Sequence, residues 1–436
     1  MNISLNKLDK ESIIGNLIIL IISLFPFFFI TGPFLTDLNS IIIGIIFLFT
    51  ISKEKKWQEC FNNYYFIFFL VIFFYLNLNS FFSFNKEISF SKSLPFIRII
   101  IFIFALSFFL QRFTQIYKYF FYCFVFFISL MLLDSFIQLL SGFNIFGSKI
   151  DYQNRISSLF GDELIMGSYI TRLLPIIVSI VFIIDYKKKY FINIIILIIS
   201  TILVFLSAER LAMFYLVSFL IFYFLIIKKY FFKFFVTILF LIFLIHYNNP
   251  NFTLRIVDNT IKQIRQTESI TSYRHSLHYK TAFDMFLDKK IFGYGLKAFR
   301  YICSDYKYEN LIKEKQEKDI LRQGGKAEDY VKEYKNGCNT HPHNIYLEFL
   351  SELGIIGFLL FFTIFLYALF NIINFIIKFF IFKINDNLII SKNLILFGIF
   401  IQMFPLVPSG SYFNNYMLLI FHISVGFYLS LMKIKK

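Results

Sequence analysis

Apolar runs long enough to cross a bilayer recur from one end of the chain to the other, separated by short polar segments. A membrane-spanning helix needs roughly 20 predominantly apolar residues, because each residue advances the helix by only about 1.5 Å. By this criterion the sequence predicts an all-α, polytopic membrane protein of about twelve transmembrane helices. The predicted spans are 13–31, 38–52, 64–82, 94–111, 117–140, 167–185, 190–207, 210–227, 230–247, 347–371, 388–407 and 412–432.

Basic residues alternate from one short loop to the next. They follow every even-numbered predicted span, as in Lys187, Lys188 and Lys189, whereas intervening loops such as 31–36 and 408–412 are uncharged. Positively charged loops stay in the cytoplasm. We therefore expect both termini to be cytoplasmic.

One loop, from about Tyr247 to Asn344, is far longer than the others and lies between the ninth and tenth predicted spans. The alternation of charge places it outside the cytoplasm. The sequence thus divides into helices 1–9 at 1–247, a loop domain at 248–344 and helices 10–12 at 345–436.

Composition agrees with this class of protein. Hydrophobic residues make up 58% of the chain and charged residues 16%, so a soluble fold could not bury the apolar surface. The formal net charge of +16 could indicate nucleic-acid binding in a soluble domain. Here the lysines in alternate loops account for it, so we expect membrane lipids and no nucleic acid as partners.

The long loop contains two recognisable segments. Leu277, Phe283, Phe286 and Leu287 recur near helical spacing among polar residues, which predicts an amphipathic helix on the membrane surface. The segment 305–335 mixes charges of both signs and is typical of a solvated insert.

Cys303 and Cys338 flank the charged insert. An oxidising compartment permits a disulfide between them, which would stabilise the loop by about 4 kcal/mol in the chain-entropy model. Two unpaired thiols are the alternative.

His343 is the first candidate for chemistry. Pro342 suits the first turn of a helix, and the positive end of a helix dipole disfavours an imidazolium there. A neutral imidazole can accept a proton from a hydroxyl. An interfacial anchor is the alternative for an isolated histidine. His341 could assist or cap, and because no third ligand cluster accompanies the pair, we expect no metal.

Arginines near the predicted outer face are candidates for binding anions. Arg210 lies between two apolar runs with almost no loop, and Glu209 beside it could form a structural ion pair. Arg274 opens the amphipathic helix, where attraction to lipid head groups is the alternative role. Arg155 and Arg172 precede and enter the sixth span, and guanidinium groups bind phosphate oxygens in a bidentate manner.

Three further features are less specific. Arg98 and Asp134 fall inside the fourth and fifth spans, where they could pair across the bundle or line a cavity for lipid head groups. The Gly293-Tyr294-Gly295 run resembles part of a nucleotide-binding pattern, but no βαβ unit surrounds it, so a turn is expected.

The stretch around the histidines resembles the signature of the bacterial O-antigen ligase and polymerase family, through 341–344, Leu347, Gly354 and Gly357. Three weaker segments resemble the family in the same order: 155–175, 207–211 and 272–300. The resemblance covers the chain from Arg155 onward. Glu209 departs from it, because small residues are often found there.

The resemblance implies a metal-independent, inverting glycosyltransferase without a cofactor. A glycan on a polyprenyl pyrophosphate would pass to a hydroxyl of an acceptor such as lipid A-core, at the periplasmic face of the bacterial inner membrane. His343 would be the base, and Arg210 and Arg274 would clamp the pyrophosphate. The expected substrate-binding residues are Arg155, Arg172, His341, Asn344 and Arg300.

Two alternatives remain open. A polymerase would use a second polyprenyl-linked glycan as acceptor, although a single dominant outer loop favours a ligase. A non-catalytic transporter or flippase would place ionisable groups near the midplane, whereas this chain gathers Arg and His at one face.

Overall fold

The computed structural model is helical throughout the residues it describes, which are 5–151, 155–248, 273–305, 307, 308 and 337–432. For 5–12, 248, 273 and 274 it describes the backbone alone. Over these ranges there is no β-strand, only a single bridge between Phe143 and Lys149. The predicted all-α class is therefore confirmed.

Each of the twelve predicted spans coincides with a helix or a pair of helices. They are α1 (Leu5–Ser23) with α2 (Phe25–Thr31), α3 (Pro33–Lys53), α5 (Tyr64–Phe81), η1 (Leu94–Phe96) with α7 (Ile97–Arg112), α8 (Gln115–Ser141), α9 (Met166–Ile183), α10 (Lys189–Ser207), α11 (Arg210–Ile226), α12 (Phe231–Asn248), α19 (Ile345–Phe382), α20 (Asn387–Gln402) and α21 (Asn415–Met432). Short helices α4 (Trp57–Phe61), α6 (Lys86–Ser93), η2 (Ser158–Phe160), α15 (Tyr273–Asp288) and α16 (Phe299–Ile302) lie between them.

Length decides which of these helices can cross a bilayer alone. In the described part of the chain eight are long and apolar enough, or nine when α1 and α2, bent by 51°, count as one broken span. The other three, α11, α12 and α20, are apolar but shorter. The structure thus supports a multi-pass protein, and the count of twelve stays a prediction.

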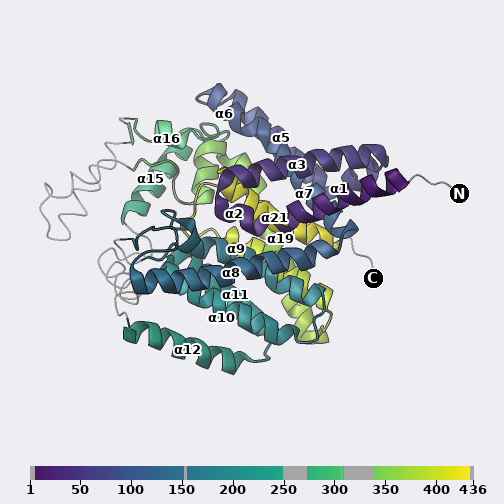
Figure 1. Ribbon diagram of the computed structural model, residues 1–436. Coiled ribbons are helices and arrows are strands. Elements are labelled where there is room, and N and C mark those ends of the chain that lie inside the picture. Colours follow the sequence, from purple (N-terminus) through teal and green to yellow (C-terminus); the bar gives the residue numbers. More distant parts are fainter. Residues whose placement is uncertain (1–4, 152–154, 249–272, 306, 309–336, 433–436) are drawn as a thin grey trace, which may run out of the picture.

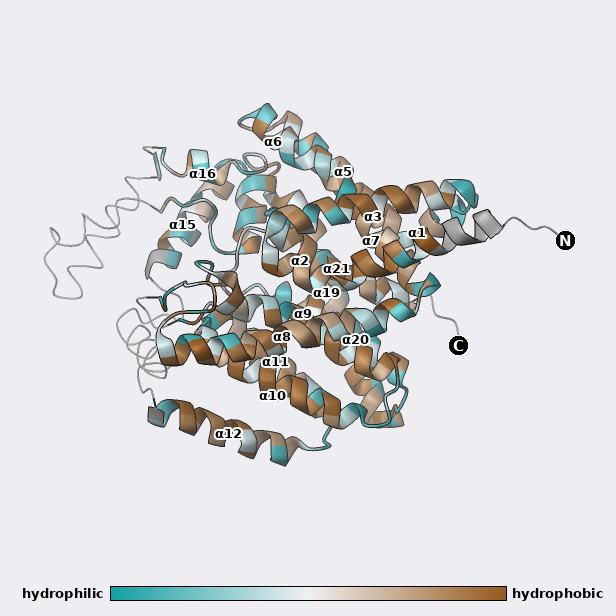
Figure 2. Ribbon diagram, in the orientation of Figure 1, coloured by the Kyte–Doolittle hydropathy of each residue, from teal (hydrophilic) through white to brown (hydrophobic). Residues whose placement is uncertain are grey.

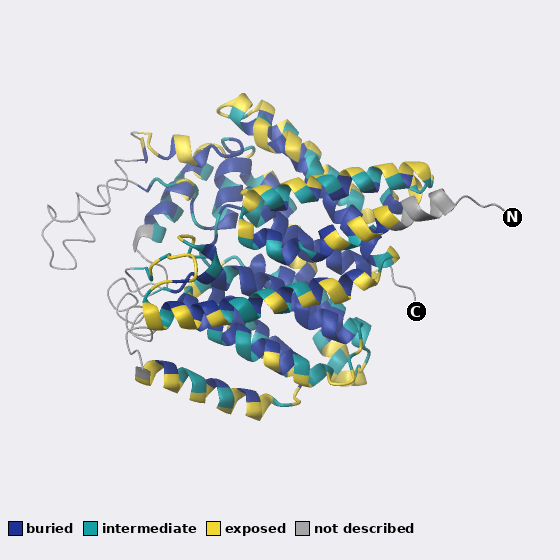
Figure 3. Ribbon diagram, in the orientation of Figure 1, coloured by how far each residue is buried: buried dark blue, intermediate teal, exposed yellow. Residues whose placement is uncertain are grey.

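Two helices form the centre of the bundle. In their most apolar windows α9 is 89% buried and α21 is 78% buried, whereas α3 and α5 are 33% buried. Figure 3 shows the difference, with exposed positions along the flanks of α3, α5 and α12. Figure 2 shows that the spans are predominantly apolar, so these exposed flanks suit contact with lipid tails.

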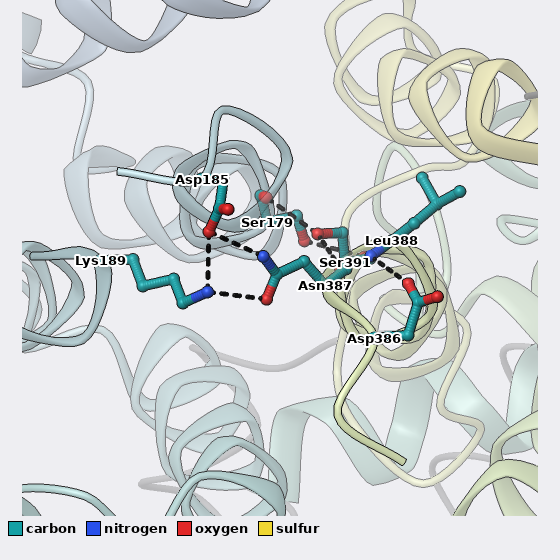
Figure 4. Close-up of polar contacts among 7 residues, drawn as sticks. All are labelled: Ser179, Asp185, Lys189, Asp386, Asn387, Leu388 and Ser391. Carbon is teal, nitrogen blue, oxygen red and sulfur yellow. Dashed lines mark hydrogen bonds and ion pairs between the residues drawn. The ribbon is translucent and has the colours of Figure 1, made fainter. Parts of the chain in front are cut away.

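Helix α20 packs closely on α9. A Cβ at Gly398 would lie 2.7 Å from the Pro175 ring, so only glycine lets the two helices approach this closely there. Further along, Ser179 and Ser391 each donate a hydroxyl to the other's carbonyl, at 3.0 and 3.1 Å. Figure 4 shows these bonds beside a polar network at the helix ends.

That network links the ends of α9, α10 and α20. The Lys189 ammonium donates to Asp185 at 2.8 Å and to Asn387 at 3.0 Å. Asn387 in turn donates to Asp185 at 2.8 Å, and Asp386 caps α20 by accepting from Leu388 N (Figure 4). The network thus ties the start of α20 to the end of α9 and the start of α10.

The bundle has two distinct ends. The start of α1 and the end of α21 lie at one end, and α15 and α16 lie at the opposite end (Figure 1). The candidate residues discussed below belong to elements at the α15 end. The predicted amphipathic helix is α15, and Leu277 on it is buried, whereas Phe283 and Leu287 are each 45% exposed.

Candidate functional site

The tenth predicted span is broken near its start, and the break anchors the long loop. Within α19, Gly354 adopts φ 68° and ψ −169°, which interrupts the helical hydrogen bonds. Tyr294 N donates to Ser351 O at 3.0 Å, and Gly295 N donates to Glu352 O at 2.7 Å. Ile355 N donates to the carbonyl of Lys290 at 2.8 Å. The turn therefore supplies the partners that the broken helix loses.

Two glycines make this joint possible. A Cβ at Gly354 would lie 2.2 Å from the Ile291 carbonyl oxygen, and one at Gly293 would lie 2.5 Å from the Glu352 carbonyl carbon. Both residues also have positive φ, at 68° and 66°, which glycine adopts without strain. The Gly-Tyr-Gly run is thus a turn, as expected, and it holds the loop against α19.

The segment before His343 is tied to α16. Cys303, the residue after α16, forms a disulfide with Cys338, and their Cα atoms are 5.1 Å apart. A small apolar cluster beneath the disulfide joins α15 to α16 through Ala282, Met285 and Phe299. The structure thus contains the predicted pair, Cys303 with Cys338. A peptide map of protein isolated without reductant tests this pairing.

The helix that follows the histidines starts later than we expected. Asn344 is its N-cap, and its side chain accepts hydrogen bonds from Tyr346 N and Leu347 N at 3.0 and 3.1 Å. Asparagine is among the best N-cap residues, which explains the boundary. His343 therefore lies before the helix in a left-handed conformation, with φ 56°, and not in the first helical turn.

The backbone around His343 is held by the loop before α21. Ser409 N donates to the His343 carbonyl at 2.8 Å, and Ser409 Oγ accepts from Ile345 N at 3.0 Å. Asn344 also donates to the carbonyl of Pro405 at 2.8 Å. A histidine in a sparsely populated conformation is stable only when its neighbours fix it in this way.

Four histidines gather here, although the sequence indicated only two. The ring of His343 lies 4.2 Å from His341, 5.1 Å from His275 and 5.4 Å from His278, measured between centroids. His275 and His278 are three residues apart and share one face of α15. In the described residues no group of three potential ligands is arranged to hold a metal ion.

Neighbouring groups fix which nitrogen of His343 can accept a proton. The Asn339 side-chain oxygen accepts from Thr340 N at 2.7 Å, which orients the amide so that its nitrogen lies 3.0 Å from His343 Nε2. The amide nitrogen can only donate, so Nε2 acts as the acceptor and a neutral ring carries its proton on Nδ1. If the hydroxyl of a bound ligand displaced the Asn339 amide from His343, it would donate its hydrogen bond to the basic lone pair on Nε2.

His341 lies in a less polar position. Burial lowers its pKa, and the positive charges of Lys297 and Arg300 act in the same direction, while the charge of Glu348 opposes them. The His341 ring is thus neutral over a wider pH range than an exposed histidine would be.

Two buried acidic side chains lie on α19, and one of them, Glu348, is within electrostatic range of His341. Glu348 and Glu352, one turn apart on α19, are each 1% exposed. Glu348 accepts from Ser411 Oγ and, at 2.8 Å, from Tyr412 N. Glu352 accepts from Lys297 N at 2.8 Å and from Phe299 N at 3.2 Å. These bonds satisfy both carboxylates and link α19 to the two loops beside it.

Glu209 binds a helix terminus. Its carboxylate accepts from Gly167 N at 2.6 Å and from Ser168 Oγ at 2.6 Å, in the first turn of α9. Burial raises its pKa, while the Ser168 hydroxyl and the charge of Arg155 act in the opposite direction. The acidic residue that departs from the family pattern thus stabilises the positive end of α9.

Two of the predicted arginines are near this acidic residue: Arg210 follows it in the sequence, and the charge of Arg155 acts on it. Arg210 is the first residue of α11 and is exposed. Arg155 donates to the carbonyls of Ser207 and Leu164, at 3.2 and 2.7 Å. Arg155 therefore fastens the loop that presents Arg210.

The remaining predicted residues are distributed more widely. Arg172 is 4% exposed and donates to Gln402 at 2.9 Å, so its guanidinium is inside the bundle. Arg300 is exposed on α16. The backbone of Arg274 lies in the first turn of α15, and its side chain is outside the described part of the structure. Substrate contact by any of them stays a prediction.

Arg98 and Asp134 do not pair with each other. Arg98 binds Asp37 at 3.0 Å, and Asp134 accepts from Ile145 N and Ser158 Oγ, both at 2.7 Å. The bonds of Asp134 are therefore local: they hold the loop that follows its own helix and do not cross the bundle.

The fold and the site define a multi-pass helical membrane protein that gathers histidines and cations at one end of its bundle. Residues 195–362 match the family model described as O-Antigen ligase. The match spans Arg210, α15 and the His341–His343 segment. No curated protein sequence matches the chain.

Proposed function

We propose that this protein transfers a glycan from a polyprenyl pyrophosphate to a hydroxyl of an acceptor glycolipid, as a ligase acting on lipid A-core. The observation that carries the proposal is His343, whose Nε2 is held as a hydrogen-bond acceptor at the polar end of an apolar bundle. A neutral imidazole in this state can remove a proton from a sugar hydroxyl.

The step needs no other reactant. The acceptor hydroxyl replaces the Asn339 amide at His343 Nε2, and its proton moves to that nitrogen as its oxygen attacks the anomeric carbon. The bond from the anomeric carbon to the pyrophosphate oxygen breaks, and the electron pair leaves with the polyprenyl pyrophosphate. Attack opposite the leaving group inverts the anomeric centre.

Cations would stabilise the leaving group. Arg210 and Arg274 are proposed to bind the pyrophosphate, because a guanidinium can donate two parallel hydrogen bonds to phosphate oxygens. The bonds of Arg155 to the neighbouring carbonyls support this role for Arg210 by fixing its loop. Charge stabilisation and positioning would then supply the rate enhancement, without a metal or cofactor.

The site would lie at the periplasmic face of the inner membrane, with both termini in the cytoplasm. The alternation of basic loops supports this orientation. The start of α1 and the end of α21 lie at the end of the bundle opposite α15 and α16 (Figure 1), which fits the same orientation.

The test is transfer from purified polyprenyl-pyrophosphate glycan to lipid A-core, with EDTA present, by the wild type and by His343→Ala. Loss of a general base should lower the rate by about 10²–10⁴-fold. His246→Ala is the matched control, because His246 is exposed near the end of α12. Full activity in His343→Ala with normal membrane insertion would contradict the role of His343. Transfer only to a second polyprenyl-linked glycan would identify a polymerase.

A further inference from the structure

A second group of cations lies beside the histidines. None of its four members belongs to the proposed clamp, and two of them lie outside the segment that matches the family model. Its members are Lys92 at the end of α6, Arg98 in the first turn of α7, Lys297 before α16 and Arg300 within α16. Lys92 lies within electrostatic range of the charges of Lys297, Arg98 and Arg300. Lys92 and Arg98 precede the family-matched segment, 195–362.

The joint at Gly354 brings these cations together although their positions in the sequence are about 200 residues apart. The turn at 290–295 binds α19 on one side and the start of α6 on the other, because Phe84 N donates to Tyr294 O at 2.7 Å. A Cβ at Gly295 would lie 2.2 Å from Ser83 Cβ, so the two segments are in close contact. This contact holds α6 beside the segment that carries Lys297 and Arg300.

A small cavity opens between α6, α7 and α21. Its volume is about 90 Å³, and Lys92, Arg98 and Asn415 are among the residues that line it. A single water needs roughly 10–15 Å³ on this measure, so the cavity admits a group of several heavy atoms. Arg98 Nε is buried and has no hydrogen-bond partner among the described residues.

Acidic groups balance the cations only in part. Arg98 Nη1 lies 3.0 Å from Asp37 Oδ2, which also accepts from Asn415 at 3.3 Å. Lys297 donates its ammonium to Ser411 at 2.6 Å and lies near the two buried carboxylates of α19. Lys92 and Arg300, by contrast, are exposed, so their charges are available to a ligand.

Arg210 of the proposed clamp belongs to a different part of the bundle from Lys92 and Arg98. Arg210 opens α11, which packs on α9 and α20. Lys92 and Arg98 belong to α6 and α7, which pack on α5, α3 and α21. In Figure 1, α6 and α11 accordingly lie on opposite sides of α21. His341 is within electrostatic range of Lys297 and Arg300, so the second group borders the histidines.

We propose that Lys92, Arg98, Lys297 and Arg300 form a subsite for a phosphate group of the acceptor glycolipid. A transfer between two lipid-linked substrates requires that both reach the base at once, and two separate anion sites would hold them apart. The inference rests on the proposed function in taking the second substrate to be a lipid-linked glycan.

Binding tests this subsite independently of transfer. The full-length protein in phosphatidylcholine vesicles is titrated with diphosphorylated lipid A, with lipid A lacking both phosphates, and with undecaprenyl pyrophosphate. The variant is Lys92→Gln/Arg300→Gln, because both side chains are exposed and their loss leaves no buried charge unpaired. Lys86→Gln is the matched control, since Lys86 is an exposed lysine at the other end of α6.

The expected result is that the double variant binds diphosphorylated lipid A about tenfold or more weakly, as for a lost charge-assisted bond. Its affinities for undecaprenyl pyrophosphate and for dephosphorylated lipid A should be unchanged, and Lys86→Gln should match the wild type. Weaker binding of undecaprenyl pyrophosphate alone would assign the cations to the donor, and unchanged binding of every lipid would also overturn the proposal. Phosphate-dependent binding without any transfer would retain the subsite and reject the proposed reaction.

Discussion

Replacing Asn339 by aspartate puts a negative charge where a neutral amide now lies 3.0 Å from His343 Nε2. An opposite charge at such a distance raises the pKa of a histidine by roughly one to three pH units. For any histidine of ordinary pKa, about 6.5, a rise of two pH units lowers the neutral fraction at pH 7 about 25-fold.

The sign of the effect follows from the role of His343 as a base. Only the neutral ring can accept a proton, so Asn339→Asp should slow transfer at neutral pH and less so at alkaline pH. A part of the loss should persist at alkaline pH, because a carboxylate beside Nε2 favours the tautomer that carries its proton on Nε2. The assay is the initial rate of glycan transfer from about pH 6 to pH 10, with the acidic limb of the profile displaced by about two pH units.

Two controls separate charge from structure. Asn339→Ala removes the hydrogen bond without adding charge, and should change the rate only about 2- to 12-fold with no displacement of the profile. Asn85→Asp adds the same charge at the N-cap of α6, where asparagine and aspartate are nearly equivalent. If Asn339→Asp left the acidic limb where it lies in the wild type, His343 would not be the base.

Three other changes test separate features of the molecule. Arg210→Lys should reduce transfer at least about tenfold despite the retained charge, because an ammonium cannot form two parallel bonds to a pyrophosphate; activity equal to the wild type would contradict the clamp. Gly354→Ala should lower the thermal midpoint, since the positive φ alone costs about 1–3 kcal/mol, whereas Gly410→Ala, with only ordinary contacts around its Cβ, should not. In intact spheroplasts an impermeant thiol reagent should label Glu87→Cys, and it should label Lys55→Cys only after lysis; the reverse pattern would invert the proposed orientation.

The helices could be predicted because each is specified locally. A run of about 20 apolar residues has few alternatives to a helix in a bilayer, where every backbone group needs an internal partner. Every predicted span coincides with a helix or helix pair for this reason. Boundaries were less accurate where a cap or a proline decides them. The Asn344 N-cap moved the start of α19 to Ile345, and the first span proved to be two helices with Pro26 in the first turn of the second.

The break in α19 could not be predicted, because its cause lies about 60 residues earlier in the chain. The run from Ile345 to Phe382 is apolar almost throughout, and Gly354 and Gly357 are tolerated in many transmembrane helices. The helix opens at Gly354 only because the turn at 290–295 supplies the missing hydrogen bonds. Because the turn and the break depend on each other, neither segment carries a sequence pattern that predicts its conformation alone.

The site could be predicted only in part for a similar reason. His343 was visible from its motif, but His275 and His278 approach it through tertiary contacts of α15. A local signal for them did exist, since two histidines three residues apart share one face of a helix. The same holds for Glu348 and Glu352, whose carboxylates one turn apart in an apolar helix are costly unless bonded.

The joint at Gly354 links the two halves of the proposed reaction. On one side it holds the loop whose backbone binds Glu352 and whose Lys297 is within electrostatic range of His341. On the other side it contacts the start of α6, and so sets the position of Lys92. A base and an anion subsite must keep a fixed separation if an acceptor is to present its hydroxyl correctly, and misplacement by about 1 Å can cost about 100-fold in rate. The joint fixes this separation through backbone hydrogen bonds and close backbone contacts at two glycines, without depending on side-chain rotamers.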